Sequence, residues 1–176
     1  MKLFLLEVSS KHGKLADIVQ KVGDVQCAWL LLLYCVNTRA NYYCRTIPPN
    51  QSSDFALAHV QKLWQCLGGI LNIDTQSIGE SWRILGPLPF SKGGISLRSA
   101  FETRPAAYWA SWADYLEMVH QRHPDVAESV LGKFNRNEGA AAECKIQLES
   151  LGCELPTWAE CVEGKRPPKI EGSEDD

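Results

Sequence analysis

Apolar residues recur along this sequence at the spacing of α-helices. In the clearest case, Ala56, Val60, Leu63, Leu67 and Ile70 follow one another at spacings of four, three, four and three residues. A helix with 3.6 residues per turn gathers such positions on one face. No stretch shows the strict apolar–polar alternation of a half-buried strand. The pattern therefore predicts an all-α fold, an irregular bundle of about five to seven helices.

Further helices are expected before this one. Residues 14–22 form a short candidate helix, and Asp24 is a candidate N-cap for the apolar segment 25–36. We expect that segment to be a helix because it is rich in Trp, Leu and Ala. A buried strand stays open as an alternative, since periodicity does not separate the two in a short apolar run. Ser53 and Asp54 are candidate caps for the helix with the clear stripe.

In the C-terminal part, proline residues are expected to open helices. Pro105 can begin a helix, because its fixed φ suits the first helical turn. The apolar stripe of that helix consists of Trp109, Trp112, Leu116 and Val119. Pro124 or Asp125 begins the next helix, a further stripe starts at Ala141, and Pro156 opens a final short turn.

Glycine and proline also mark where helices cannot continue. Residues 72–94 hold four glycines and two prolines, which predicts one long Gly/Pro-containing loop. Residues 165–176 contain two prolines and Ile170 as their single apolar residue, so we expect a disordered, acidic C-terminal tail. Residues 1–164 are then expected to form a single helical domain.

The length and composition agree with one globular domain: 176 residues, of which 45% are hydrophobic and 22% charged. The net charge of -3 argues against nucleic-acid binding through overall basicity. The charge is unevenly distributed, however. Residues 1–36 have a net charge of +1, residues 37–104 of +3 and residues 105–176 of -7. A basic middle segment is therefore hidden in an acidic total.

The cysteines and the apolar segments indicate an intracellular protein. Seven scattered cysteines are an odd number and unlike a secreted disulfide framework, so we expect reduced thiols that pack as small apolar groups. The longest apolar stretch, residues 25–36, has about twelve residues, fewer than the ~20 that cross a bilayer. The apolar run at the start ends at Glu7, and no small-residue cleavage site of a signal peptide follows it. We expect the nucleus or the cytoplasm, with no membrane.

The sequence predicts no metal site and no catalytic group. No CxxC pair occurs, and His120 and His123 have no Cys or further His nearby in the sequence. Asp17, Asp24, Asp54, Asp74 and Asp114 are isolated on the sequence, and the adjacent pair Asp175-Asp176 lies in the polar tail, where it is not expected to hold a metal ion in fixed geometry. Gly93-Gly94 lacks the Lys-Ser/Thr of a phosphate-binding loop. A cysteine-dependent enzyme stays an alternative only if a thiol lies beside His12, His59 or His120. No catalytic residue, cofactor or small-molecule substrate is therefore predicted.

Basic, amide and aromatic side chains cluster in two segments of the basic middle region. The candidate nucleic-acid-binding residues are Arg39, Asn41, Tyr42 and Arg45 in the first segment, and Lys92, Arg98 and Arg104 in the second. Arginine and amide groups contact phosphates, and aromatic rings stack on bases or sugars. The commoner alternative is that Tyr42 and Tyr43 pack in the core and that the arginines are solvated or paired with Asp54 or Glu102.

The order of several short segments resembles a known protein family. The segments are Gln26–Leu33, Thr38–Tyr42, Ile47–Pro49, Leu88–Ala100, Ala106–Asp114, Pro156–Glu160 and Arg166–Pro168. Together they are similar to the region downstream of the polymerase palm in the reverse-transcriptase reading frames of non-LTR retrotransposons. In particular, Leu88–Ala100 resembles the family's leucine-proline element that continues into Gly-Gly-Leu-Gly-Leu. The resemblance covers roughly residues 22–168 and includes no catalytic signature.

The resemblance implies an RNA-directed DNA polymerase origin and a thumb-like role. Such a segment packs beside an upstream polymerase domain and grips the backbone of an RNA/DNA template-primer. The palm carboxylates and their aromatic-X-Asp-Asp turn are absent from this sequence, so the expectation is a truncated fragment that is not an enzyme by itself. Any Mg²⁺ would belong to the palm. Ser96 stands where the family has glycine, and a positive φ there would cost ~1 kcal/mol or more.

A protein-interaction module without a nucleic-acid role is the alternative function. It is favoured by six tryptophans, a residue type enriched at interface hot spots: Trp29, Trp64, Trp82, Trp109, Trp112 and Trp158. Exposure of Trp82 and Trp158 beside an apolar patch, with the arginines scattered over different faces, would support this alternative.

Overall fold

The described part of the chain is entirely helical in its regular structure. The computed structural model describes residues 2–74 and 80–167, and no strand occurs among them. The α-helices are α1 (Lys2–Val19), α2 (Val25–Leu31), α3 (Ala40–Thr46), α4 (Pro49–Leu71), α5 (Glu80–Leu85), α6 (Ala100–Arg122), α7 (Pro124–Asn135), α8 (Ala140–Ser150) and α9 (Trp158–Val162). The predicted all-α fold is confirmed, and short helices such as α5 and α9 supplement the longer ones.

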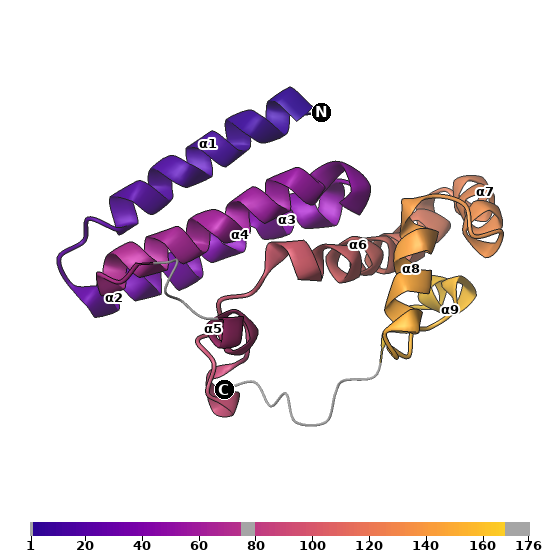
Figure 1. The fold of residues 1–176 in the computed structure, drawn as a ribbon. Helices are drawn as coiled ribbons and strands as arrows, with labels where there is room; N and C mark the ends of the chain where they lie inside the picture. Colours follow the sequence, from indigo (N-terminus) through magenta and orange to yellow (C-terminus); the bar gives the residue numbers. More distant parts are fainter. Residues whose placement is uncertain (1, 75–79, 168–176) are drawn as a thin grey trace. The chain divides into compact units, whose positions relative to one another are not determined.

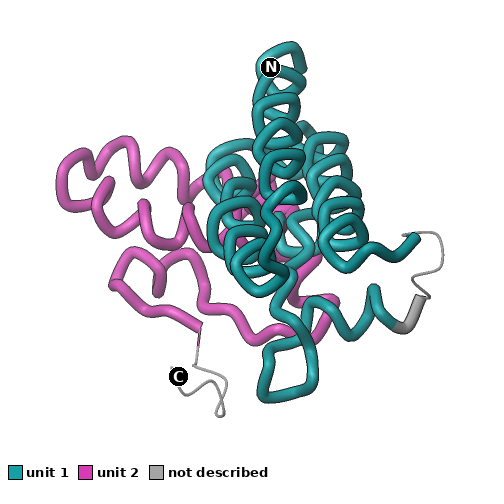
Figure 2. Tube along the Cα trace, turned by 90° about the vertical axis from the view of Figure 1, so that its left-hand side faces the viewer, with its two compact units in different colours: residues 1–104 teal, residues 105–176 magenta. Residues whose placement is uncertain are grey.

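The chain divides into two compact units, residues 1–104 and residues 105–176 (Figure 2). The sequence pattern predicts a single domain over residues 1–164, and the hydrophobic pattern does not mark this division, because the boundary falls inside helix α6. The boundary coincides with the change in charge. The first unit has eleven Lys/Arg and seven Asp/Glu, for a net +4, and the second has a net -7. We call them the basic unit and the acidic unit.

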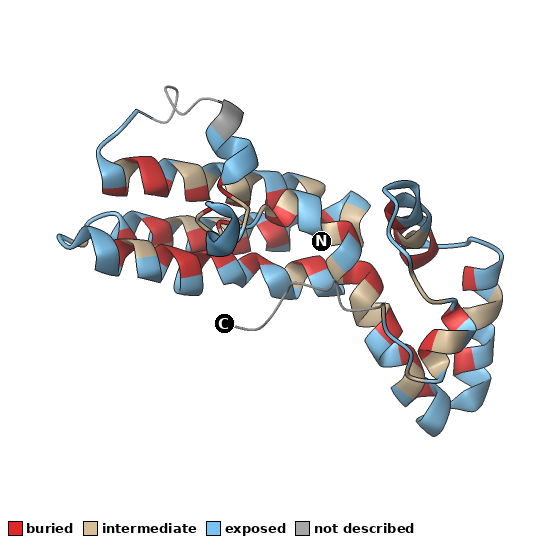
Figure 3. Ribbon diagram, turned by 90° about the horizontal axis from the view of Figure 1, so that it is seen from below, coloured by how far each residue is buried: buried red, intermediate tan, exposed pale blue. Residues whose placement is uncertain are grey.

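The core of the basic unit lies where α4 packs against α1 and against the segment from α2 onward (Figure 1). Buried residues follow the inner sides of these helices in Figure 3. The core residues are Ala16, Val19, Ala28, Leu32, Val36, Leu63, Cys66, Leu67, Ile70 and Leu97. Two of them are alanines, whose small side chains allow neighbouring helices to approach closely. The predicted apolar stripe of α4 therefore faces the core, with only Val60 half-buried.

Helix α4 begins earlier than the sequence predicts. Its N-cap is Pro48, and Pro49 occupies the first turn, so Ser53 and Asp54 lie inside the helix rather than at its start. Proline suits this position because its fixed φ is helical and its missing N–H would have no partner there. At the other end, Asn72 has φ +52 and ends the helix in the left-handed conformation.

The segment 25–36 is helical, which excludes the buried-strand alternative. Asp24 is its N-cap, as predicted, and its carboxylate accepts a hydrogen bond from the Cys27 amide at 2.7 Å. After α2 the helix widens to a π-helical turn, Leu32–Val36, and then tightens to a 3-10 turn, Asn37–Arg39, before α3. Helix α1 begins at Lys2, well before the predicted residues 14–22, because Leu5, Val8 and His12 continue its buried stripe, and it ends at Val19, before the predicted end.

The predicted loop over residues 72–94 contains short helices, with residues 75–79 outside the described part. Helix α5 is followed by a 3-10 turn, Phe90–Lys92. The chain then folds back: the Gly86 carbonyl accepts hydrogen bonds from the amides of Ile95 and Leu97, and the Leu88 carbonyl accepts one from Ser96. A Cβ at Gly94 would overlap the Leu88 carbonyl, so this close return requires glycine.

Helix α6 begins at Ala100, so Pro105 lies inside it instead of opening it. Proline in a helix leaves the carbonyl four residues earlier without its amide donor. Here that carbonyl belongs to Phe101, and the Arg104 guanidinium donates to it at 2.6 Å. The side chain beside the proline therefore replaces the missing backbone hydrogen bond, which explains why the helix continues.

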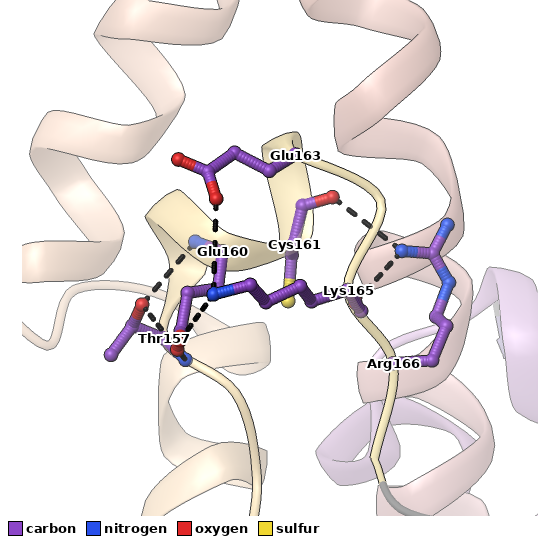
Figure 4. Close-up of polar contacts among 6 residues, drawn as sticks. All are labelled: Thr157, Glu160, Cys161, Glu163, Lys165 and Arg166. Atoms are coloured by element: carbon purple, nitrogen blue, oxygen red, sulfur yellow. Dashed lines mark hydrogen bonds and ion pairs between the residues drawn. The ribbon is translucent and has the colours of Figure 1, made fainter.

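The acidic unit has an aromatic core. Trp158 of α9 lies against Phe134 of α7 and Trp109 of α6, with ring centroids 4.5 and 6.1 Å apart. Thr157 caps α9 through a capping box with Glu160 (Figure 4). The hydrogen bond from the Thr157 amide and the contact with Lys165 lower the pKa of Glu160 to about 2.

The predicted disordered tail is described only at its start. Lys165 pairs with Glu160 at 3.0 Å (Figure 4). Arg166 pairs with Asp114 at 3.0 Å and with Glu117 at 3.3 Å, both on α6. These two residues are thus placed by ion pairs rather than disordered, and residues 168–176 lie outside the described part.

Replacing Ser96 by glycine is expected to stabilise the protein. Ser96 has φ +54, the left-handed region that costs a non-glycine residue about 1–2 kcal/mol, against ~0.5–1 kcal/mol for the extra freedom of unfolded glycine. Ser96→Gly should therefore raise the free energy of unfolding by about 0.5–1 kcal/mol in a denaturant titration. Ser91→Gly, in the nearby 3-10 turn at negative φ, is the matched control and should lower it. Destabilisation by Ser96→Gly would contradict backbone strain at this position.

Candidate nucleic-acid interface

The first candidate segment, residues 37–45, separates buried from exposed side chains by helical geometry. Asn37, Ala40 and Cys44 face inward, at spacings of three and four residues. The candidate residues between them, Arg39, Asn41, Tyr42 and Arg45, are all exposed. The sequence of this short segment therefore places its cationic, amide and phenol groups on the solvent side.

Two hydrogen bonds join this segment to residues 96–100, more than fifty positions later. The Asn37 side-chain amide donates to the Ser96 carbonyl at 3.4 Å, and the Cys44 thiol donates to the Ala100 carbonyl at 3.7 Å. Both pairs advance in the same direction along the chain. They place Arg39 and Arg45 beside the segment that carries Arg98, so three candidate arginines belong to neighbouring backbone segments. We call Arg39, Arg45 and Arg98 the arginine group.

The candidate arginines differ in their exposure and in the contacts that their side chains make within the chain. Arg39 and Arg98 are exposed, and the Arg39 Nε donates to the Cys35 carbonyl at 3.1 Å. Arg104 is half-buried, and its guanidinium lies 3.7 Å from the centroid of the Phe101 ring while it completes helix α6. Arg104 therefore stabilises helix α6. It is close in sequence to Arg98, but we do not include it in the arginine group.

The two tyrosines divide between the predicted alternatives. Tyr43 is half-buried and contacts the rings of Phe4, His12 and Phe55, as the core-packing alternative expects. Tyr42 is 67% exposed and touches Tyr43 edge-on, with ring centroids 5.3 Å apart. Tyr42 thus has a free ring face suited to stacking, whereas Tyr43 supports it from the core side.

Lys92 is not joined to the arginine group by these contacts. The 3-10 turn that carries it is anchored by Phe90, whose ring contacts Trp29 of α2 at a centroid distance of 5.4 Å. Trp29 precedes Arg39 by ten residues, which corresponds to roughly 15 Å of helix. The structure therefore brings the two predicted segments together at Asn37–Ser96 and Cys44–Ala100, but it holds Lys92 at the α2 end.

The basic unit contains a pair of histidines in contact, which the sequence does not predict. His12 of α1 and His59 of α4 are both buried, with ring centroids 5.4 Å apart in an edge-on arrangement. The His59 Nε2 lies 3.4 Å from the Asn37 carbonyl, whereas the His12 Nδ1 is buried without a hydrogen-bond partner. Burial, together with the nearby His59 and Arg39, lowers the pKa of His12 to about 4. These rings are therefore neutral core residues at neutral pH.

Two buried thiols of the basic unit, Cys44 and Cys66, are not activated as nucleophiles. All seven cysteines are free, and Cys44, Cys66, Cys144 and Cys161 are buried. Burial raises the pKa of Cys44 and of Cys66 to about 11, so both are neutral thiols, and each donates to a backbone carbonyl. Neither Cys44 nor Cys66 is therefore the thiolate beside a histidine base that the cysteine-dependent alternative needs.

Within the described residues, no group of three or more His, Cys, Asp or Glu side chains is arranged to hold a metal ion. None of the described helices combines the length and the apolar character needed to cross a bilayer. Comparison of the chain with protein-family models, with curated proteins and with solved structures gives no match.

The histidine pair predicts how stability depends on pH. The pKa of His12 is about 4 in the folded chain and 6.5 as its ordinary value, so between these pH values the unfolded chain binds more protons. The free energy of unfolding should consequently fall as the pH is lowered from 6.5 towards 4. Denaturant titrations of His12→Phe should show a weaker dependence in this range. His123→Phe, at an exposed position, is the matched control and should keep the original dependence; equal slopes in both variants would contradict the assignment.

Proposed function

We propose that the basic unit binds the sugar-phosphate backbone of nucleic acid, with an RNA/DNA template-primer as its ligand. The observation that carries the proposal is the joining of residues 37–45 to residues 96–100, which collects the arginine group from two distant parts of the sequence. Phosphate contacts by arginine are the main source of affinity in sequence-independent binding.

The net charge of the basic unit supports this proposal, although the net charge of the whole chain is negative. The unit with the arginine group has a net charge of +4, whereas the other has -7. A locally positive unit attracts a polyanion even when the total charge is negative. Asn41 and Tyr42, exposed next to Arg39 and Arg45, supply an amide for sugar or phosphate and a ring for stacking.

We further propose that the chain derives from a retroelement reverse transcriptase and corresponds to its thumb and post-palm region. The proposal rests on the order of sequence segments described above. The left-handed backbone at Ser96 supports it, because that geometry suits the glycine of the family's element. In this proposal the chain grips nucleic acid but does not polymerise by itself, since the palm carboxylates are absent from its sequence.

A protein-interaction module is the second candidate function. Trp82 is 56% exposed, which favours it, whereas Trp158 is buried in the acidic unit, which does not. Arg39, Arg45 and Arg98 belong to neighbouring backbone segments, whereas Lys92 lies apart from them. Exposure of Trp82 is therefore the observation that favours this alternative.

Binding to a labelled RNA/DNA hybrid should be detectable by fluorescence anisotropy at low salt and should weaken steeply as salt is raised. Counterion release makes log affinity fall linearly with log salt, and each arginine–phosphate ion pair contributes about one to the steepness of that line. A triple variant, Arg39→Gln with Arg45→Gln and Arg98→Gln, should therefore reduce the slope by about three.

The control for this titration changes the same number of charges elsewhere. Arg122, Lys133 and Arg136 belong to the acidic unit, and their joint replacement by glutamine should leave the slope within about one of the original. An equal reduction in both triple variants would contradict the proposed surface. Binding that does not depend on salt would contradict phosphate recognition altogether.

A further inference from the structure

The basic unit contains a cavity of about 460 Å³ that the proposed nucleic-acid surface does not use. It lies between α2, α4 and α5. Its lining residues are Val25, Gln26, Trp29, Trp64, Leu67, Leu71, Ile73, Trp82 and Ile95. No candidate nucleic-acid-binding residue is among them. The cavity is therefore independent of the arginine group.

Among the described residues that line it, none is charged and Gln26 is the single polar one. Two other cavities of the basic unit are different. One of about 500 Å³ is lined by Arg83 and Glu102 among others, and one of about 280 Å³ by His12 and Lys62 among others. A charged group that entered the uncharged cavity would lose its hydration without gaining an ionic partner. The lining therefore selects a neutral occupant.

Two of the three indole rings are held from outside the cavity. Trp29 meets the Phe90 ring edge-on, with centroids 5.4 Å apart. Trp64 lies directly on Gly86, where a Cβ would overlap the indole. Side chains fixed in this way lose little further freedom when a ligand binds, which favours affinity. Gly86 thus leaves space for the Trp64 indole, which forms one wall of the cavity.

The rim of the cavity leaves large apolar side chains in water. Trp82, Val25, Leu71 and Ile73 are each about half exposed. Exposed apolar groups scattered singly are ordinary, but these four border one concave, uncharged space. Its volume lies in the range of small-molecule sites, which are mostly apolar with a few polar groups that orient the ligand.

We propose that this cavity binds a small, neutral molecule that contains an aromatic ring. The indoles of Trp29, Trp64 and Trp82 offer ring faces and edges to such a ligand, and the Gln26 amide can hydrogen-bond a hydroxyl or carbonyl group on it. The site is a second binding function of the basic unit and does not depend on nucleic-acid binding.

The neutral fluorescent probe N-phenyl-1-naphthylamine tests the site on the full chain. We expect saturable one-to-one binding with increased probe fluorescence and quenching of tryptophan emission. Two competitors of nearly equal size separate the neutral from the charged ligand class: 1-naphthalenemethanol should displace the probe about tenfold more effectively than 1-naphthoate. Equal displacement by the anion would overturn the proposed ligand class.

A matched pair of substitutions on α4 locates the probe. Leu71 is 47% exposed and lines the cavity, whereas Leu57 is 45% exposed and does not. Leu71→Arg should weaken probe binding about tenfold or more, because it introduces a charge at the apolar rim, and Leu57→Arg should leave it within about twofold. Circular dichroism shows whether each variant keeps its helices, and Gln26→Leu tests the polar group without adding a charge.

Besides equal displacement by the anion, two main results would overturn the proposal. One is the absence of saturable probe binding to the folded chain. The other is equal weakening by Leu71→Arg and Leu57→Arg, which would place the probe elsewhere. If Leu71→Arg unfolds the chain, Ile73→Asp carries the same test from a residue outside the helices. Retained affinity in that variant would also overturn the site.

Discussion

The burial of one side of α4 against two other helical segments is the constraint on which the basic unit depends. Leu63, Cys66, Leu67 and Ile70 of α4 share one core with Ala16 and Val19 of α1, and with Ala28, Leu32 and Val36 of the segment that begins at α2. Because α1 and α2 both pack against α4, the apolar side of α4 determines where these two helices lie. The inward side of residues 37–45 is set by the same packing, and the exposure of Arg39 and Arg45 on the outer side follows from it.

Much of this arrangement could be predicted from the sequence, because helices with one buried face leave a clear periodic trace. The stripe from Ala56 to Ile70 is such a case, and the Asp24 cap is another. The start of α4 and the continuity of α6 could not be predicted in this way. Both depend on how proline is accommodated: Pro49 lacks a donor where none is needed, and Arg104 replaces the donor that Pro105 lacks.

The sequence predicts which residues the candidate surface contains, but it does not predict that the two segments carrying them lie side by side. Arg39, Arg45 and Arg98 are recognisable as basic residues in a basic segment, but only the Asn37–Ser96 and Cys44–Ala100 hydrogen bonds show that the two segments meet. Contacts between residues more than fifty positions apart leave no local pattern. The same reason explains why the His12–His59 pair and the tryptophan-lined cavity are not evident from the sequence. The positive φ at Ser96 is an expectation only of the family resemblance, in which this position is a glycine.

In the proposed binding mode, residues 37–45 and 96–104 form one surface that receives a nucleic-acid backbone. Hydrogen–deuterium exchange, measured by mass spectrometry on the full chain with and without an RNA/DNA hybrid at low salt, distinguishes this mode from the alternatives. The hybrid should slow exchange in both segments together and leave α7 and α8 unchanged. Protection confined to α7 and α8, or to one of the two segments alone, would be incompatible with a shared surface.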